Sequence, residues 1–259
     1  MIIIKDQKNQ DKSLQETAIE INNINRTKGV SFSTDKYTVM SNKLVWSKQK
    51  MTLQEARLFR ILTTQSEPED SEIYIYTCTI QNLADMIGVS SQNIYRDIRK
   101  ICNKLTKQNI GFETKDPKDP WEYIPVMYTA KYDGQGTVTL ALNERLIPFI
   151  LGLRKNYTQY QLKEILKFSS FYAIRFYELI KSQMFKEDPN IEFRLDKLRT
   201  VLGCESKFQR FDNFRQWVIE PSIRDINENS NLVLRNWDTI TEGRKVVGIK
   251  LTAIELPKK

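Results

Sequence analysis

Two short stretches of this 259-residue chain carry amides and cations in an order that suits contact with nucleic acid. In the first stretch, short polar side chains precede arginines and a lysine: Ser91, Gln92, Asn93, Arg96, Arg99 and Lys100. The second stretch has the same kind of residues with one tryptophan among them: Gln209, Arg210, Asn213, Gln216, Trp217 and Arg224. Amides and arginines can form bidentate hydrogen bonds to base edges, and cations neutralise phosphates. Both stretches are candidate DNA contacts, although ordinary solvated helix faces often have this composition.

The first stretch lies in a predicted helix-turn-helix. A short amphipathic helix is indicated by Leu83, Ala84, Met86 and Ile87, and Gly88 follows where a tight turn needs glycine. Ser90 or Ser91 is expected to cap a second helix. The apolar residues of that helix recur at helical spacing: Ile94, Ile98, Ile101 and Leu105. This spacing leaves the polar residues of the first stretch on the outer side.

The segments around this motif complete the plan of a winged helix. Before it, Thr52-Leu-Gln-Glu55 is a capping box that opens a helix, and Ile73–Thr77 alternates as a short strand would. After it, the strand-like segments Trp121–Ala130 and Thr137–Leu142 flank a strong turn signal at Asp133–Gly136. A hairpin directly after a helix-turn-helix is a wing. This long β-rich hairpin also offers an edge for pairing with a second subunit.

The second half of the chain repeats the plan. One long helix is predicted over Tyr160–Gln183, and the helix that follows it ends in Leu198-x-x-x-Leu202-Gly203, the counterpart of Leu83-x-x-x-Ile87-Gly88. A second helix is expected from Phe208 onward, with its apolar side facing inward, the second stretch facing outward, and a kink at Pro221.

The second wing follows this helix. Leu232–Leu234 and Val246–Leu251 are β-rich and flank a turn over Thr241–Lys245. The tip of this wing carries Arg244 and Lys245, cations that suit phosphate or minor-groove contact as well as plain solubility.

The whole chain is therefore predicted to be an α+β protein of two tandem winged-helix domains with β-hairpin wings. Residues 1–30 form a flexible arm with a short helix over Leu14–Ile24, residues 31–152 the first domain and residues 153–259 the second. The segment Asn143–Asn156 is predicted to be a helix and then the link between the domains.

The overall composition favours a polyanionic partner in a reducing compartment. Forty basic against thirty-two acidic side chains give a net charge of +8. No stretch reaches the ~18 apolar residues of a membrane helix, and the N-terminus lacks the features of a signal peptide. The three cysteines have no paired spacing and are interpreted as buried, reduced thiols, so a cytoplasmic location is expected.

Several catalytic classes are excluded by residue type. The chain has no histidine, which nickases with a His-hydrophobic-His metal site, zinc hydrolases and Ser-His or Cys-His nucleophiles all require. It also lacks the glycine-rich loops that cradle the phosphates of ATP and dinucleotides, and no cofactor is expected. Eleven tyrosines leave a tyrosine-dependent nickase or recombinase as the rival from the enzymes, which the absence of histidine disfavours.

Taken in order, several stretches between residues 40 and 255 resemble the replication initiators of iteron-controlled plasmids, the family of RepE, RepB and π. The stretches are Ser41-Asn-Lys-Leu-Val45, Tyr157-Thr-Gln-Tyr160, Ser169–Leu179, Phe211–Ser222 and Glu242-Gly-Arg244. The resemblance implies that the C-terminal winged helix makes the principal major-groove contacts and that the N-terminal one adds contacts or mediates dimerisation. It implies base reading by the helix from Phe208 onward, with Lys207, Arg210, Asn213 and Arg215 as leading candidates. The helical wheel places Arg215 near the buried stripe.

The resemblance also implies the partners. Monomers of such initiators bind repeated iterons in duplex DNA and recruit the host initiator and helicase, while dimers in equilibrium with them repress the initiator's own gene. A chaperone is a further expected partner. The protein then controls plasmid copy number, is not an enzyme and does not enter membranes. A transcriptional regulator with the same fold remains the leading alternative, because its binding physics would be identical.

Overall fold

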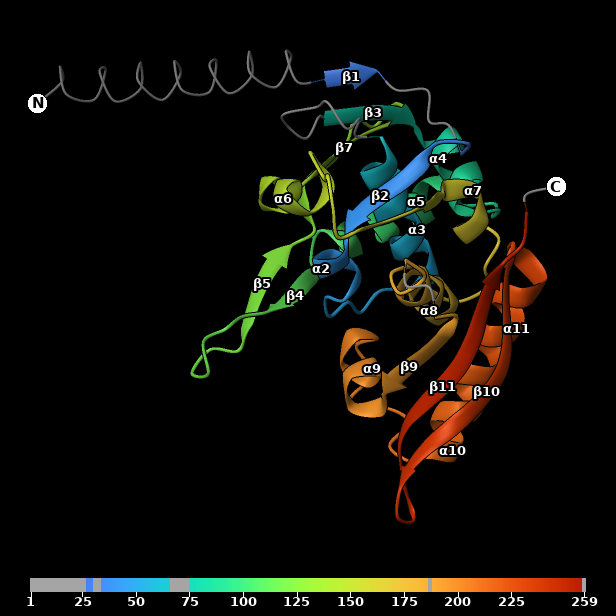
Figure 1. Cartoon of the computed structure of the whole chain (residues 1–259). Helices are drawn as coiled ribbons and strands as arrows, with labels where there is room; N and C mark the ends of the chain where they lie inside the picture. Colours follow the sequence, from blue (N-terminus) through green and yellow to red (C-terminus); the bar gives the residue numbers. More distant parts are fainter. Residues whose placement is uncertain (1–26, 30–33, 66–74, 186–187, 258–259) are drawn as a thin grey trace, which may run out of the picture.

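The computed structural model describes residues 27–29, 34–65, 75–185 and 188–257, and Figure 1 shows two lobes, with the α9–α11 segment and its long hairpin below the remainder. The helix expected over Leu14–Ile24 lies outside the described residues. Of the predicted arm, only Thr27–Gly29 is described, and it forms strand β1, which pairs in parallel with β3 (Ile75–Thr79). No helix in the described ranges has the length and apolar character needed to span a membrane.

The upper lobe is built on a four-stranded sheet of order β1-β3-β7-β6 and on helix α3 (Leu53–Thr64). The capping box that opens α3 is confirmed: Glu55 N donates to Thr52 Oγ1 at 3.3 Å, and Thr52 N donates to Glu55 Oε2 at 3.0 Å. Apolar side chains of α3 are fully buried, among them Phe59 and Leu62. The helix thus forms the centre of this lobe's core.

The first helix-turn-helix is present as predicted. It consists of α4 (Ile80–Ile87) and α5 (Ile94–Leu105), and Gly88 ends α4 in the left-handed region at φ +72°. The predicted cap is wrong in detail, because α5 begins after Asn93 without a side-chain cap. Ser91 instead lies in the turn, where its Oγ accepts from Asn93 N at 3.2 Å and donates to Asp97 at 2.8 Å.

The first wing is β6 (Met127–Tyr132) and β7 (Thr137–Leu142), joined through the predicted turn at Asp133–Gly136. The prediction of one strand over Trp121–Ala130 is wrong. Residues Trp121–Pro125 form β5, which pairs with β4 (Asn109–Glu113) in a separate two-stranded hairpin. This second hairpin projects from the upper lobe in Figure 1.

The single long helix predicted over Tyr160–Gln183 is also wrong. Tyr157–Gln161 is strand β8, paired with the distant β2 (Tyr37–Ser41), and it is followed by α7 (Leu162–Ile165) and α8 (Phe171–Lys181). Ser170 starts α8 afresh, since its Oγ accepts from Ala173 N at 3.0 Å. The predicted helix over the segment from Asn143 is short: η1 (Glu144–Leu146) and α6 (Ile147–Ile150), while α2 is Asn42–Val45.

The lower lobe contains the second winged helix. Its sheet has the order β10-β11-β9, formed by β10 (Leu232–Glu242), β11 (Lys245–Glu255) and β9 (Asn190–Arg194). Helix α9 (Leu195–Val201) is followed by a continuous helical run of α10 (Phe211–Phe214), the π-helical turn η2 (Arg215–Ile219) and α11 (Glu220–Asn229).

The kink expected at Pro221 takes the form of this π-helical turn. Glu220 N donates to Arg215 O, five residues back, directly before the proline that has no N–H to donate. The second helix begins at Phe211, and not at Phe208, which lies in the left-handed region at φ +53°. Lys207 therefore lies in the turn, and Arg210 is the N-cap residue.

A buried ionic cluster ties α3 to α8. Arg60 Nε and Nη2 donate to the two carboxylate oxygens of Glu178, each at 2.8 Å, and Arg175 Nη1 donates to the same carboxylate at 2.7 Å. Tyr160 Oη donates to it at 2.6 Å, and all three charged side chains are 0% exposed. The Glu178 carboxylate thus accepts four hydrogen bonds, from Arg60, Arg175 and Tyr160.

The turn of the second helix-turn-helix packs tightly against the segment before α3. Gln49 N donates to Val201 O at 3.3 Å, and Gly203 lies so close that an added Cβ would be 2.5 Å from the Gln49 carbonyl oxygen. Gly203 also has φ +59°, where glycine carries no steric penalty. The ion pair between Lys48 and Glu205 lies at the same junction. These contacts join the second helix-turn-helix to the segment that leads into α3 of the upper lobe.

Candidate nucleic-acid interface

Helix α5 presents its predicted contact residues to solvent. Arg96, Arg99 and Lys100 are exposed on the helix, while Ile98, Cys102 and Leu105 fill the core behind them. The Arg96 side chain is 73% exposed, with Asp97 3.4 Å away, so nearly all of its donors point to solvent. Ser91, Gln92 and Asn93 are exposed in the turn that leads into the helix, and not on the helix itself.

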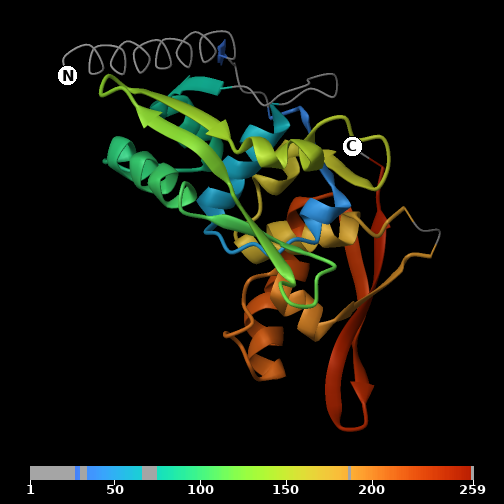
Figure 2. The ribbon, with the colours of Figure 1, turned by 90° about the vertical axis from the view of Figure 1, so that its left-hand side faces the viewer.

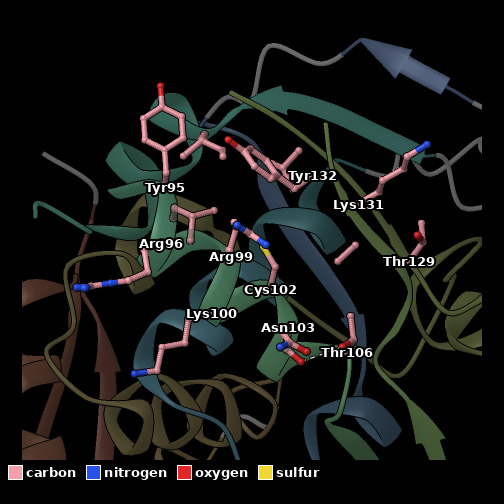
Figure 3. Close-up of a pocket in the computed structure, with 14 residues that line it drawn as sticks. Tyr95, Arg96, Arg99, Lys100, Cys102, Asn103, Thr106, Thr129, Lys131 and Tyr132 are labelled. Carbon is pink, nitrogen blue, oxygen red and sulfur yellow. Dashed lines mark hydrogen bonds between the residues drawn. The ribbon is translucent and has the colours of Figure 1, made fainter. Parts of the chain in front are cut away.

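An open groove runs between α5 and the first wing, with a volume of ≈ 1010 Å³. Figure 3 shows Tyr95, Arg96, Arg99 and Lys100 along α5, with Lys131 and Tyr132 of β6 across the groove. The Arg99 guanidinium lies over the Tyr132 ring, 5.2 Å from its centroid. This cation–π contact orients Arg99 without using its hydrogen-bond donors, which stay available for an anion.

The α10–η2–α11 helix shows the same division of faces; this helix and α5, which were predicted to contact DNA, are called the reading helices below. Phe214, Val218, Ile223 and Ile226 are buried, while Asn213, Gln216 and Arg224 are exposed, as the wheel predicts. Arg210 is 81% exposed and stands 3.8 Å from Asp212. Trp217 is 61% exposed, a large apolar surface in the middle of a polar face.

Arg215 differs from the wheel. Its side chain is 46% exposed and lies within 4 Å of both Asp212 and Glu220. The wheel assumed a constant 100° for each residue, but η2 contains more residues for each turn than an α-helix, so the phase changes at Arg215. The structure thus places Arg215 on the outer surface, although two carboxylates share its charge.

The tip of the second wing is fully open to solvent. Arg244 and Lys245 are exposed at the turn between β10 and β11, and neither forms an ion pair with a described residue. The tip is the lowest point of the molecule in Figure 1. It can reach beyond the body of the lower lobe.

Three buried thiols and two carboxylates in the turns have pKa values shifted by their surroundings. Burial raises the pKa of the Cys78 and Cys102 thiols to about 12 and that of Cys204 to about 11, so these free cysteines are protonated at neutral pH. The hydrogen bond from Ser91 lowers the pKa of Asp97, and backbone N–H groups of the wing turn lower that of Asp133. Both carboxylates therefore stay ionised and fix the turns next to the groove.

The two reading helices are exposed on one side of the molecule. In Figure 2, α5 lies toward the left of the upper part of the view, and the orange segment that contains α9 and α10 projects below it. Between them lie cations that the sequence interpretation missed: Lys50, Lys104 and Lys107. A signal was present, because Lys100, Lys104 and Lys107 recur at a spacing that puts them on one face of α5 and its extension.

Two family models match the chain. The first, described as the WH1 domain of the initiator replication proteins, matches residues 37–181. The second, described as the WH2 domain of the initiator Rep proteins, matches residues 194–253. The first match continues past residue 152, and the domain division predicted at that point stays a prediction.

Two known proteins are similar over most of the chain. A replication initiation protein of Escherichia coli is 25% identical over 201 residues, which are 75% of this chain and 63% of that protein. The crystal structure of the Pi initiator protein in complex with iteron DNA matches with a TM-score of 0.70 and 18% identity, over 87% of this chain and 100% of that chain. This likeness shows the fold: two tandem winged helices. With more than half of its residues matched by the first model alone, the chain belongs to the initiator Rep protein family.

Proposed function

We propose that this protein initiates plasmid replication by binding repeated iteron sequences in duplex DNA. The observation that carries the proposal is the presence, in one chain of the initiator family, of two helix-turn-helix units whose exposed faces carry arginines and amides. The structural relative is described as bound to iteron DNA, and the Escherichia coli relative as a replication initiation protein.

In this proposal the two lobes share the binding. The α10–η2–α11 helix reads base edges with Arg210, Asn213 and Gln216, the second wing grips phosphate through Arg244 and Lys245, and α5 adds contacts from the upper lobe. The protein acts by binding in the cytoplasm and performs no catalysis. Monomers bind iterons and engage the host initiator and helicase, while homodimers repress the protein's own gene, and a chaperone is a further partner.

The test is footprinting and competition binding on the DNA that flanks the gene. We expect protection of short direct repeats, and a preference of at least about 10³ for a repeat over a scrambled duplex at physiological salt. Equal affinity for the two duplexes would refute the proposal. Deletion of the gene then distinguishes the two functions. A fall in plasmid copy number indicates an initiator, and an unchanged copy number indicates a transcriptional regulator with the same fold.

A further inference from the structure

A hollow of ≈ 460 Å³ lies at the junction of the two helix-turn-helix units. Its walls come from the end of α5, the segment before α3, the start of α8 and the turn after α9. Four lysines line it, one or two from each of three segments: Lys50, Lys104, Lys107 and Lys207. No predicted contact except Lys207 belongs to this hollow.

The charge of the hollow is strongly positive. All four lysines are exposed, and none forms an ion pair with any residue that the structure describes. The one carboxylate in the wall is that of Glu55, which is 1% exposed and is already engaged by Thr52 N at 3.0 Å and Gln108 Nε2 at 3.3 Å. Four cations against one carboxylate leave a net charge of +3, and such repulsion is relieved when an anion binds.

The frame around the lysines is joined by packing and by a hydrogen bond. Gly203 in the wall packs against the Gln49 carbonyl, and Gln108 ties the end of α5 to the start of α3. The lysines are therefore carried on elements whose distance is set by packing. The hollow is bordered by the end of α5 and by the turn after α9, so it is placed to contact a ligand that reaches both helix-turn-helix units.

We infer that this lysine hollow is a phosphate site, and that it holds the DNA backbone between the two segments read by α5 and by the α10–η2–α11 helix. The inference rests on the proposed function. Lysine is suited to this task, because its compact charge needs no particular orientation of the phosphate. The contact carries no sequence information; it fixes the path of the duplex from one lobe to the other.

The experiment compares salt dependence in two matched double variants of the full chain. Lys104→Ala with Lys107→Ala removes two charges from the hollow, and Lys115→Ala with Lys118→Ala removes two exposed lysines from the distant β4–β5 turn. We expect the first variant to reduce the slope of log affinity against log salt by about 1.8, which is two contacts at about 0.9 each. Its affinity should fall by the same factor for iteron and scrambled duplexes, while the control keeps the wild-type slope. A wild-type slope in the first variant, or equal changes in both, would overturn the inference.

A second arm separates the two sources of phosphate. Inorganic tripolyphosphate is titrated against the DNA-free protein and both variants at constant ionic strength. Micromolar binding that Lys104→Ala with Lys107→Ala abolishes, together with an unchanged DNA slope, would show a site for free polyphosphate and overturn the DNA assignment. The proposed function is tested separately, and it fails if the wild type binds the iteron and the scrambled duplex equally well. In that case the salt slopes of wild type and variants can still be compared, because they can be measured on any DNA.

Discussion

Replacing Glu178 with glutamine should be one of the most damaging single changes to stability in the described structure. The change keeps the shape but leaves the buried guanidinium groups of Arg60 and Arg175 without a counter-charge. Burial alone would raise the pKa of Glu178, but the two guanidinium groups and the Tyr160 hydroxyl outweigh it and lower the pKa to about 2. A fall from 4.5 to about 2 corresponds to about 3 kcal/mol, at about 1.4 kcal/mol for each pH unit. Breaking a buried ion pair costs a similar 3–5 kcal/mol or so.

Urea unfolding of the DNA-free protein at pH 7 measures this loss. Glu122→Gln, which removes the carboxylate of the exposed pair with Arg145, is the control and should cost less than about 1 kcal/mol. Because the folded pKa of Glu178 is depressed, its contribution is complete above pH 4.5 and is lost as the pH falls toward 2. The difference between wild type and Glu178→Gln should shrink over the same range. A loss at pH 7 no larger than the control's would show that the buried cluster does not stabilise the fold.

Three further outcomes are expected. Arg210→Ala should cost about 1–3 kcal/mol of binding free energy on the iteron and relax specificity, whereas Lys245→Ala should weaken binding to iteron and scrambled DNA alike. Equal losses on both duplexes for Arg210→Ala in competition binding would mean that another element reads the bases. Gly203→Ala should lower the melting temperature more than Gly243→Ala does. Both glycines have φ near +60°, but only at position 203 would the added Cβ lie against a backbone oxygen, so similar melting temperatures would contradict this packing. Tyr128→Lys should raise the monomer fraction in ultracentrifugation if the exposed edge strand β6 pairs two subunits, and an unchanged dimer would exclude that edge.

Local signals predicted the elements that are stabilised locally. The capping box at Thr52 and Glu55, the left-handed Gly88 and the Asp133–Gly136 turn each depend on residues a few positions apart, and each is present. The predictions were wrong where pairing with a distant segment determines the secondary structure. Tyr157–Gln161 is a strand because β2 pairs with it from about 120 residues away, and Trp121–Pro125 joins β4 instead of continuing into β6.

The same division applies to the candidate interface. Amphipathic spacing identified the outer faces of both reading helices, because burial on the inner side is a local periodic property. The position of Arg215 needed the π-helical turn, which a regular wheel cannot represent. The lysine hollow combines Lys50, Lys104, Lys107 and Lys207 from three segments, and only the packing of the two lobes brings these residues to one place.

The contact between Gly203 and Gln49 has a consequence for the spacing of the two DNA segments that the protein can bind at once. If this contact is kept when the proposed DNA complex forms, α5 and the α10–η2–α11 helix fit a duplex only when both recognised segments face the same side of it. B-form DNA turns once in about 10.5 base pairs, so one inserted pair rotates one segment by roughly 34° relative to the other. An insertion of about five pairs between the segments would place them on opposite faces. An insertion of about a full turn would restore the facing but lengthen the distance by about 34 Å, so under the proposed function the junction limits the spacing of the two recognised segments.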